Sequence, residues 1–195
     1  IFYVPMVPII IFIFKKKLIH WSVWPSVILC LIGGYLLTDF YSATIRLGDT
    51  LVVLGALFWS THIIFTGMMV LKFNLPLTVG AIQTFLVSIF SLIISLIYEE
   101  FILYKILNEL DSILYAGVLS GGFAFVLQIY AQRNITPAPA AIIFSLEGVF
   151  ATIAAWIILD QILKFNNILG CLFILFGVLI SQLAPLIKKN LIKNK

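Results

Sequence analysis

The chain has 195 residues, of which 63% are hydrophobic and 10% are charged, and its mean hydropathy is +1.18. A soluble domain is about 45–50% apolar and about 25% charged, so this composition excludes a water-soluble globule and indicates a protein whose solvent is lipid. The net charge is +4, but the basic residues form no stripe interleaved with aromatic residues, and we do not expect nucleic acid as a partner.

Apolar runs of helical length follow one another along almost the whole chain. A helix needs about 20 residues, at roughly 1.5 Å each, to cross about 30 Å of hydrocarbon. Period-two alternation, which would indicate strands, is not seen in the sequence. The runs cover residues 1–14, 23–38, 50–71, 75–98, 112–131, 138–159 and 166–186. The predicted fold class is all-α, a polytopic membrane helix bundle with about seven transmembrane helices.

The first run starts at Ile1, without an initiator methionine and without the basic n-region of a signal peptide. We therefore expect residue 1 to be an interior position of a longer protein.

The charges between the runs differ in sign from one predicted side of the membrane to the other. One side carries nine basic residues and no acidic residue, whereas the other carries three basic and seven acidic residues. Lys and Arg are enriched in cytoplasmic loops. The bias therefore predicts a multi-pass protein of the cell (inner or plasma) membrane with a cytoplasmic C-terminus.

A weak internal repeat relates the two ends of the chain. Residues 9–37 align without a gap on residues 153–181, a shift of 144 positions that brings Gly33 onto Gly177. The matching helix pairs are five helices apart, an odd number, so the two copies face opposite ways across the bilayer. This pattern indicates an inverted repeat, which is common in secondary transporters, and a complete design of ten helices.

Two segments carry a family resemblance: GDTLVVLGALFWSTHIIFTGMMV (48–70) and GVLSGGFAFVLQIYAQRNITPAPAAIIFSLEGVFATIAAWIILDQI (117–162). They resemble the EamA-like drug/metabolite transporter superfamily. The resemblance implies ten helices, cytoplasmic ends and transport of small organic solutes. The chain departs from the family at Gly148, where members often have proline.

This resemblance implies a division of the chain into four parts. Residues 1–38 would be the last two helices of a first repeat, without its first three, and 39–47 a connecting loop. Residues 48–186 would be the five helices of the second repeat, and 187–195 a Lys-rich cytoplasmic tail.

Three predicted helices carry small or polar residues at 4-3-4 spacing, which places them on one helix face. The stripes are Gly55, Trp59, His62 and Thr66; Gly117, Gly121, Ala124 and Gln128; and Ala141, Ser145, Gly148, Thr152 and Ala155. We expect the second and third stripes to pack against other helices. The polar side chains of the first stripe would either line a water-filled cavity or hydrogen-bond to a neighbouring helix, and the sequence leaves both alternatives open. In a cavity, Trp59 would give a solute an aromatic wall or a cation–π face.

Glu147 is a carboxylate inside an apolar run, roughly 15 Å from the helix entrance at Pro137. Such a group costs about 2.5–3.5 kcal/mol on insertion scales, so it needs a reason to be there. It would either bind substrate or a proton, or stay protonated and hydrogen-bond to a neighbouring helix; the sequence leaves both open. The candidate substrate-binding residues are Trp59, His62, Thr66, Gln128, Tyr130, Ser145 and Glu147.

Catalytic motifs such as HExxH, GxSxG or a P-loop do not occur in the sequence, so we expect no enzyme. A channel would need a repeated filter motif or charge rings, which are also missing. The sequence therefore predicts a secondary transporter of small metabolites or amphipathic solutes, working by alternating access. Its pocket would lie between the inverted halves near the bilayer midplane. The alternative is a non-functional truncated remnant or an assembly subunit of such a transporter.

The expected partners are membrane lipid and a small-molecule substrate, with protons as a candidate coupling ion and a homodimer as a candidate assembly. Cys30 and Cys171 lie in apolar runs, where we expect small core residues rather than metal ligands. No cofactor and no metal is expected.

Overall fold

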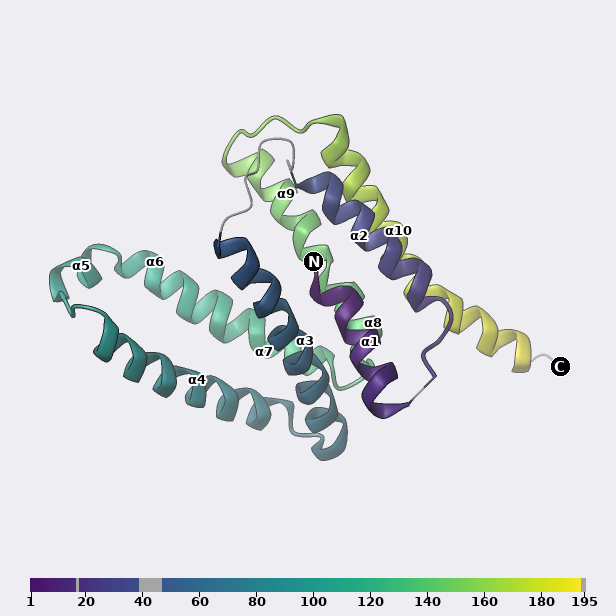
Figure 1. The fold of residues 1–195 in the computed structure, drawn as a ribbon, viewed down its shortest axis with the longest axis horizontal. Coiled ribbons are helices and arrows are strands. Elements are labelled where there is room, and N and C mark those ends of the chain that lie inside the picture. The colour runs from purple at the N-terminus through teal and green to yellow at the C-terminus, as the bar shows by residue number, and fades with distance from the viewer. Residues whose placement is uncertain (17, 39–46, 194–195) are drawn as a thin grey trace. The chain divides into compact units, whose positions relative to one another are not determined.

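The computed structural model describes residues 1–16, 18–38 and 47–193, and helices account for most of them (Figure 1). No strand occurs in these ranges. The helices are α1 (Tyr3–Lys15), α2 (Val23–Leu37), α3 (Leu47–Phe73), α4 (Pro76–Tyr98), α5 (Leu103–Asn108), α6 (Leu110–Leu114), the π-helix η2 (Tyr115–Ala124), α7 (Phe125–Ala131), α8 (Pro137–Phe144), α9 (Leu146–Ile158) and α10 (Phe165–Lys193).

These helices confirm the predicted membrane helix bundle. Five helical stretches are long and apolar enough to span a membrane: Leu47–Phe73, Pro76–Tyr98, Leu110–Ala131, Pro137–Ile158 and Phe165–Ile187. The apolar helices α1 and α2 are shorter. The loop predicted at 39–47 meets α3 at Leu47, and α10 continues through the segment predicted as a Lys-rich tail to Lys193. The assignment of these segments to repeats, a connecting loop and a cytoplasmic tail stays a prediction. Residues 39–46 of that loop lie outside the described residues.

Local chemistry fixes where several helices begin and end. Pro76 and Pro137 stand in the first turns of α4 and α8, where proline's missing N–H costs no hydrogen bond. Asn74 ends α3 in the left-handed conformation, with a φ of 56°, and its N–H donates to the Val70 carbonyl at 2.8 Å. Asparagine tolerates this conformation better than most residues, so it makes an effective helix stop.

The chain divides into two units: unit 1 comprises Ile1–Phe65 and Thr136–Lys195, and unit 2 comprises Thr66–Ile135. In unit 1, α2 and α10 lie side by side and antiparallel, and α8 packs against α1, α2 and α10 (Figure 1). Its core contains fully buried aliphatic side chains such as Val4, Ile142 and Ile174.

Glycines bring α2 and α10 into backbone contact. A methyl group at Gly33 would lie 2.6 Å from the carbonyl oxygen of Gly170 and 2.7 Å from Cγ1 of Ile174. At Gly177 it would lie 2.9 Å from the Ser26 carbonyl oxygen and 3.0 Å from Sγ of Cys30. Only glycine leaves enough room for this approach, which favours association of helices in lipid.

The two contacts are reciprocal. The shift of 144 positions that aligns Gly33 with Gly177 also brings Ser26 onto Gly170 and Cys30 onto Ile174. Exchanging the two helices by this shift therefore converts the contacts of Gly33 into the contacts of Gly177. Each helix uses equivalent positions to touch the other.

In unit 2, α4 packs against α7. A methyl group at Gly80 would lie 3.2 Å from Cδ1 of Ile129, which is 1% exposed. The hydroxyl of Thr66, near the end of α3, donates to Oε1 of Gln83 in α4 at 3.3 Å. Most of α4 is exposed and apolar, as expected for a surface that faces lipid.

The π-helix η2 overturns the packing stripe predicted on 112–131. Gly117, Gly121 and Ala124 all lie in η2, whereas Gln128 lies in α7. A π-helix turns less per residue than an α-helix because its hydrogen bonds close over five residues, so 4-3-4 spacing does not keep one face through it. Gly117 has no neighbouring atom within 4 Å of a methyl group placed on it, so it makes no close helix contact.

Candidate functional site

The predicted helix 138–159 is interrupted at Ser145, between α8 and α9. Around it, two hydrogen bonds span three residues instead of four. The Ser145 N–H donates to the Ile142 carbonyl at 3.2 Å, and the Gly148 N–H donates to the Ser145 carbonyl at 3.2 Å. The Ser145 hydroxyl also donates to the Ile142 carbonyl. Serine hydroxyls that bond back to the preceding turn often bend helices, and short 3₁₀ turns inside a helix often mark hinges.

Polar side chains gather around this interruption from several helices of unit 1. Ser145 is 1% exposed, and its Oγ lies 3.4 Å from Sγ of Cys30 in α2. The phenol of Tyr3 in α1 is within electrostatic range of both Glu147 and Cys30. The Ser60 hydroxyl of α3 donates to the Ala56 carbonyl at 2.6 Å, and its oxygen also lies 3.4 Å from the Tyr3 carbonyl oxygen. We call these five residues, Tyr3, Cys30, Ser60, Ser145 and Glu147, the polar cluster.

Glu147 stands in the first turn of α9 and its side chain is exposed. A carboxylate at a helix N-terminus interacts favourably with the helix dipole, by about 0.3–1 kcal/mol. Within the part of the chain that the structure describes, Glu147 makes no hydrogen bond to a neighbouring helix. Its predicted role in binding substrate or a proton stays a prediction.

The third predicted stripe, on α8 and α9, forms a packing face. Ala141 and Ser145 are buried, and Gly148, Thr152 and Ala155 are half-buried. A methyl group at Gly148 would lie 3.5 Å from Leu37 of α2 and 3.9 Å from Ile174 of α10. The expected packing of this stripe is therefore confirmed.

Trp59 and His62 of α3 form a stacked pair. Their ring centroids are 5.0 Å apart with an interplanar angle of 20°, and both side chains are half-buried. Their stacking is an observation about the two side chains alone, and the predicted role of the pair as a solute wall stays a prediction. Thr66, the next member of the stripe, is buried and bonded to Gln83 instead, so its position is explained by helix packing.

Gln128 and Tyr130 flank the buried Ile129 in α7. Gln128 is half-buried, and Tyr130 is 47% exposed. They belong to unit 2 with Thr66, whereas Trp59, His62, Ser145 and Glu147 belong to unit 1. The structure thus brings together Trp59 with His62, and Ser145 with Glu147. A single pocket made of all seven residues stays a prediction.

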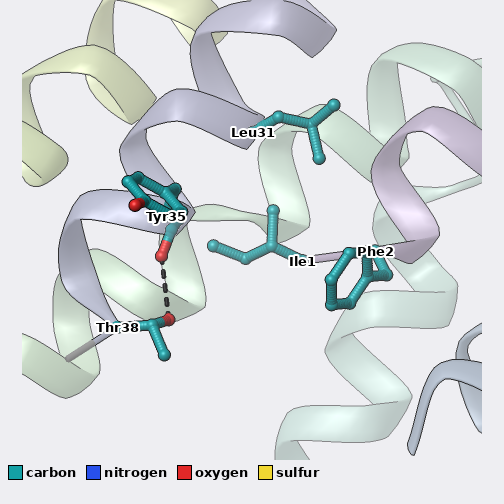
Figure 2. Close-up of a pocket in the computed structure, with 6 residues that line it drawn as sticks. Ile1, Phe2, Leu31, Tyr35 and Thr38 are labelled. Carbon is teal, nitrogen blue, oxygen red and sulfur yellow. Dashed lines mark hydrogen bonds between the residues drawn. The ribbon is translucent and has the colours of Figure 1, made fainter. Parts of the chain in front are cut away.

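A separate pocket of about 300 Å³ lies in unit 1, between Ile1 and Phe2, which precede α1, and the second half of α2 (Figure 2). Its polar edge is formed by Tyr35 and Thr38. The Thr38 hydroxyl donates to the Gly34 carbonyl at 2.9 Å. The lining residues are Ile1, Phe2, Leu31, Gly34, Tyr35 and Thr38. Its size is at the lower end of the range of about 300–1,000 Å³ that is usual for ligand pockets.

Sequence reasoning missed the pocket and three members of the polar cluster, Tyr3, Cys30 and Ser60. Tyr3 and Cys30 are single polar or small residues in apolar runs, and Ser60 falls between the stripe positions Trp59 and His62, so spacing gives no signal for any of them. Only the contacts between helices that are distant in sequence identify them. Among the described residues, no group of three His, Cys, Asp or Glu side chains could hold a metal ion.

A comparison with known protein families matches the chain to the family model described as the EamA-like transporter family, over residues 46–183. The match covers more than half of the chain and runs from α3 into α10. It includes Ser60, Ser145 and Glu147 of the polar cluster, whereas Tyr3 and Cys30 precede it. Comparisons with curated proteins and with solved structures find no match.

Proposed function

Because the chain belongs to the EamA-like transporter family, we propose that it is a secondary transporter that carries a small metabolite or amphipathic solute by alternating access. Membership of this family and the membrane-spanning helices make it a membrane transporter. The proposal adds the mechanism and the kind of solute.

The observation that carries the mechanism is the reciprocal contact between α2 and α10. The helices are antiparallel, and Gly33 and Gly177 touch the opposite helix through equivalent neighbours. Two halves related in this way have opposite orientations in the bilayer, which is the architecture of an inverted repeat. Such halves can exchange conformations, so that one pocket opens first to one side of the membrane and then to the other.

The solute would bind near the polar cluster. Glu147 is the tenth residue after Pro137 along α8 and α9, roughly 15 Å from the helix entrance and so near mid-depth. Intramembrane carboxylates commonly mark substrate paths or proton relays. We propose that Glu147 binds either the solute or a coupling proton, and that Trp59 and His62 offer an aromatic surface.

The excess of basic residues in alternate loops supports a cytoplasmic C-terminus in the cell membrane. The Lys residues at the end of α10 would then lie at the cytoplasmic headgroups.

Uptake into proteoliposomes tests the proposal. The purified protein would be reconstituted with labelled tetraphenylphosphonium, phenylalanine, uridine and glucose outside, with and without a pH gradient, and protein-free liposomes as the control. We expect saturable uptake of at least one of these solute classes. Uptake that never exceeds the protein-free control, for any solute and gradient, would refute the proposed transport of these classes.

A further inference from the structure

The glycines at which α2, α9 and α10 meet one another fall into two groups according to the space around them. At Gly33, Gly170 and Gly177 a methyl group would come within 3.0 Å of the facing helix, so packing requires glycine there. At Gly148 the nearest atom would be Cδ1 of Leu37 at 3.5 Å, an ordinary van der Waals distance. Alanine would therefore fit at position 148.

Packing thus gives no reason for glycine at position 148, and glycine has a cost there. A glycine inside a helix is less stable than alanine because it loses more conformational freedom on folding. The hydrogen bonds around Gly148 indicate where its conformational freedom matters. Gly148 donates the hydrogen bond to Ser145 that closes the turn between α8 and α9. The residue with the greatest backbone freedom is therefore part of the interruption itself.

The two helices on either side of this turn are held differently. The short helix α8 has four buried residues, Ala138, Ala140, Ala141 and Ile142, and packs against α1, α2 and α10. The longer helix α9 has one, Val149. The turn joins a firmly packed helix to one that is held mainly along the face of Gly148, Thr152 and Ala155.

We propose that residues 145–148 form a hinge, with Gly148 supplying its backbone freedom, about which α9 turns relative to α8 during transport. The inference rests on the alternating-access function proposed above and adds the moving element. Glu147 lies inside the hinge, so turning α9 changes the direction of its carboxylate.

The Ser145 hydroxyl gives the hinge a way to bend in lipid. Bending a helix weakens carbonyl–amide bonds, and an unsatisfied carbonyl is costly where no water is present. The Ser145 hydroxyl already donates to the Ile142 carbonyl, so that carbonyl keeps a partner when the backbone bond lengthens. The contact of Ser145 with Cys30 holds the fixed end of the hinge against α2.

The test compares Gly148→Ala with Gly55→Ala. Gly55 lies in the long apolar helix α3 and, like Gly148, has room for a methyl group, since no atom lies within 4 Å. Amide hydrogen exchange of the full chain in nanodiscs would be followed for residues 145–149. We expect these amides to exchange faster than those of α8, and Gly148→Ala to slow them by roughly tenfold. Gly55→Ala should leave them unchanged.

Transport gives the second readout, with whichever solute of the panel the wild-type protein carries. Gly148→Ala should lower the maximal uptake rate by about tenfold at an unchanged half-saturation concentration, because a stiff hinge slows opening without altering binding contacts. Gly55→Ala should match the wild type in both. Exchange at 145–149 as slow as in α8, or unchanged by Gly148→Ala, would overturn the hinge and leave the proposed function standing. A wild-type protein without uptake would instead refute the proposed function, while the exchange result still decides whether the hinge exists.

Discussion

Gly33 and Gly170 meet backbone to backbone: a methyl group on either residue would lie within 2.7 Å of the carbonyl oxygen of the other. The contact joins α2, near one end of the chain, to α10, near the other. It is the closest helix approach that the glycines of unit 1 make, and its energetic consequences can be measured.

Substituting Gly33 by alanine should destabilise the protein. The added methyl group overlaps the Gly170 carbonyl and the Ile174 side chain, and overpacking of this kind costs about 1–3 kcal/mol. Thermal unfolding in detergent would measure the loss. Gly55→Ala is the matched control, because an alanine there meets no atom and should raise stability by about 0.5–1 kcal/mol. Equal effects of the two substitutions would contradict the close contact.

The Thr66–Gln83 hydrogen bond should contribute modestly to the stability of unit 2. Interhelical hydrogen bonds in membranes average about 0.6 kcal/mol in double-mutant cycles, so we expect Thr66→Val and Gln83→Leu to show a coupling of about that size. Thr84→Val on the same helix is a suitable control, combined with Thr66→Val in a second cycle. A coupling in that second cycle as large as in the first would show that the 3.3 Å contact has no specific role.

Substitutions of Glu147 should distinguish its two possible roles. If the carboxylate binds solute or a proton, Glu147→Gln lowers uptake by about 10²-fold and leaves unfolding unchanged or makes the protein more stable, because an intramembrane charge is costly. If instead Glu147 is a protonated hydrogen-bond donor, glutamine replaces it well and Glu147→Leu destabilises. Glu99→Gln is the control, since Glu99 lies at the end of α4 and bonds locally to Ser95 at 2.7 Å. We expect the first pattern.

The inverted repeat predicts that Lys16 and Lys164 lie on opposite sides of the membrane. Each would be replaced by cysteine in a variant with Cys30→Ala and Cys171→Ala, and labelled in intact cells with a membrane-impermeant maleimide. We expect Lys164→Cys to react from outside and Lys16→Cys to react only after the membrane is permeabilised. Labelling of both positions from the same side would eliminate the mirror relationship between the two ends of the chain.

Hydropathy alone predicted the helices well, because lipid forces every spanning segment to satisfy its backbone internally over a fixed thickness. The ends of α3, of α4 and of the stretch Pro137–Ile158 formed by α8 and α9 fall within three residues of the predicted limits. The local geometry inside the helices was harder to predict from the sequence. The expectation of one α-helical face through Gly117 and Gly121 was wrong because the local period changes in η2, and composition does not report that change.

The candidate site was predicted only in part, for a related reason. Ser145 and Glu147 could be found because a polar residue stands out in an apolar run. Tyr3 and Cys30 could not, since the relation of Tyr3 to Glu147 and the contact of Cys30 with Ser145 depend on how α1 and α2 pack against α8 and α9. Contacts between remote helices leave no trace in local spacing.

The reciprocal glycine contacts have a mechanical consequence. Gly33 and Ser26 are seven residues apart on α2, so the two touching points are separated by roughly 10 Å along the axis. A methyl group added at Gly33 would separate α2 from α10 at that contact, while the contact at Gly177 would act as a pivot. A methyl group added at Gly177 would have the reverse effect. Chemically identical substitutions would thus splay α2 from α10 towards opposite faces of the bilayer, which would bias the protein towards one or the other of its two openings.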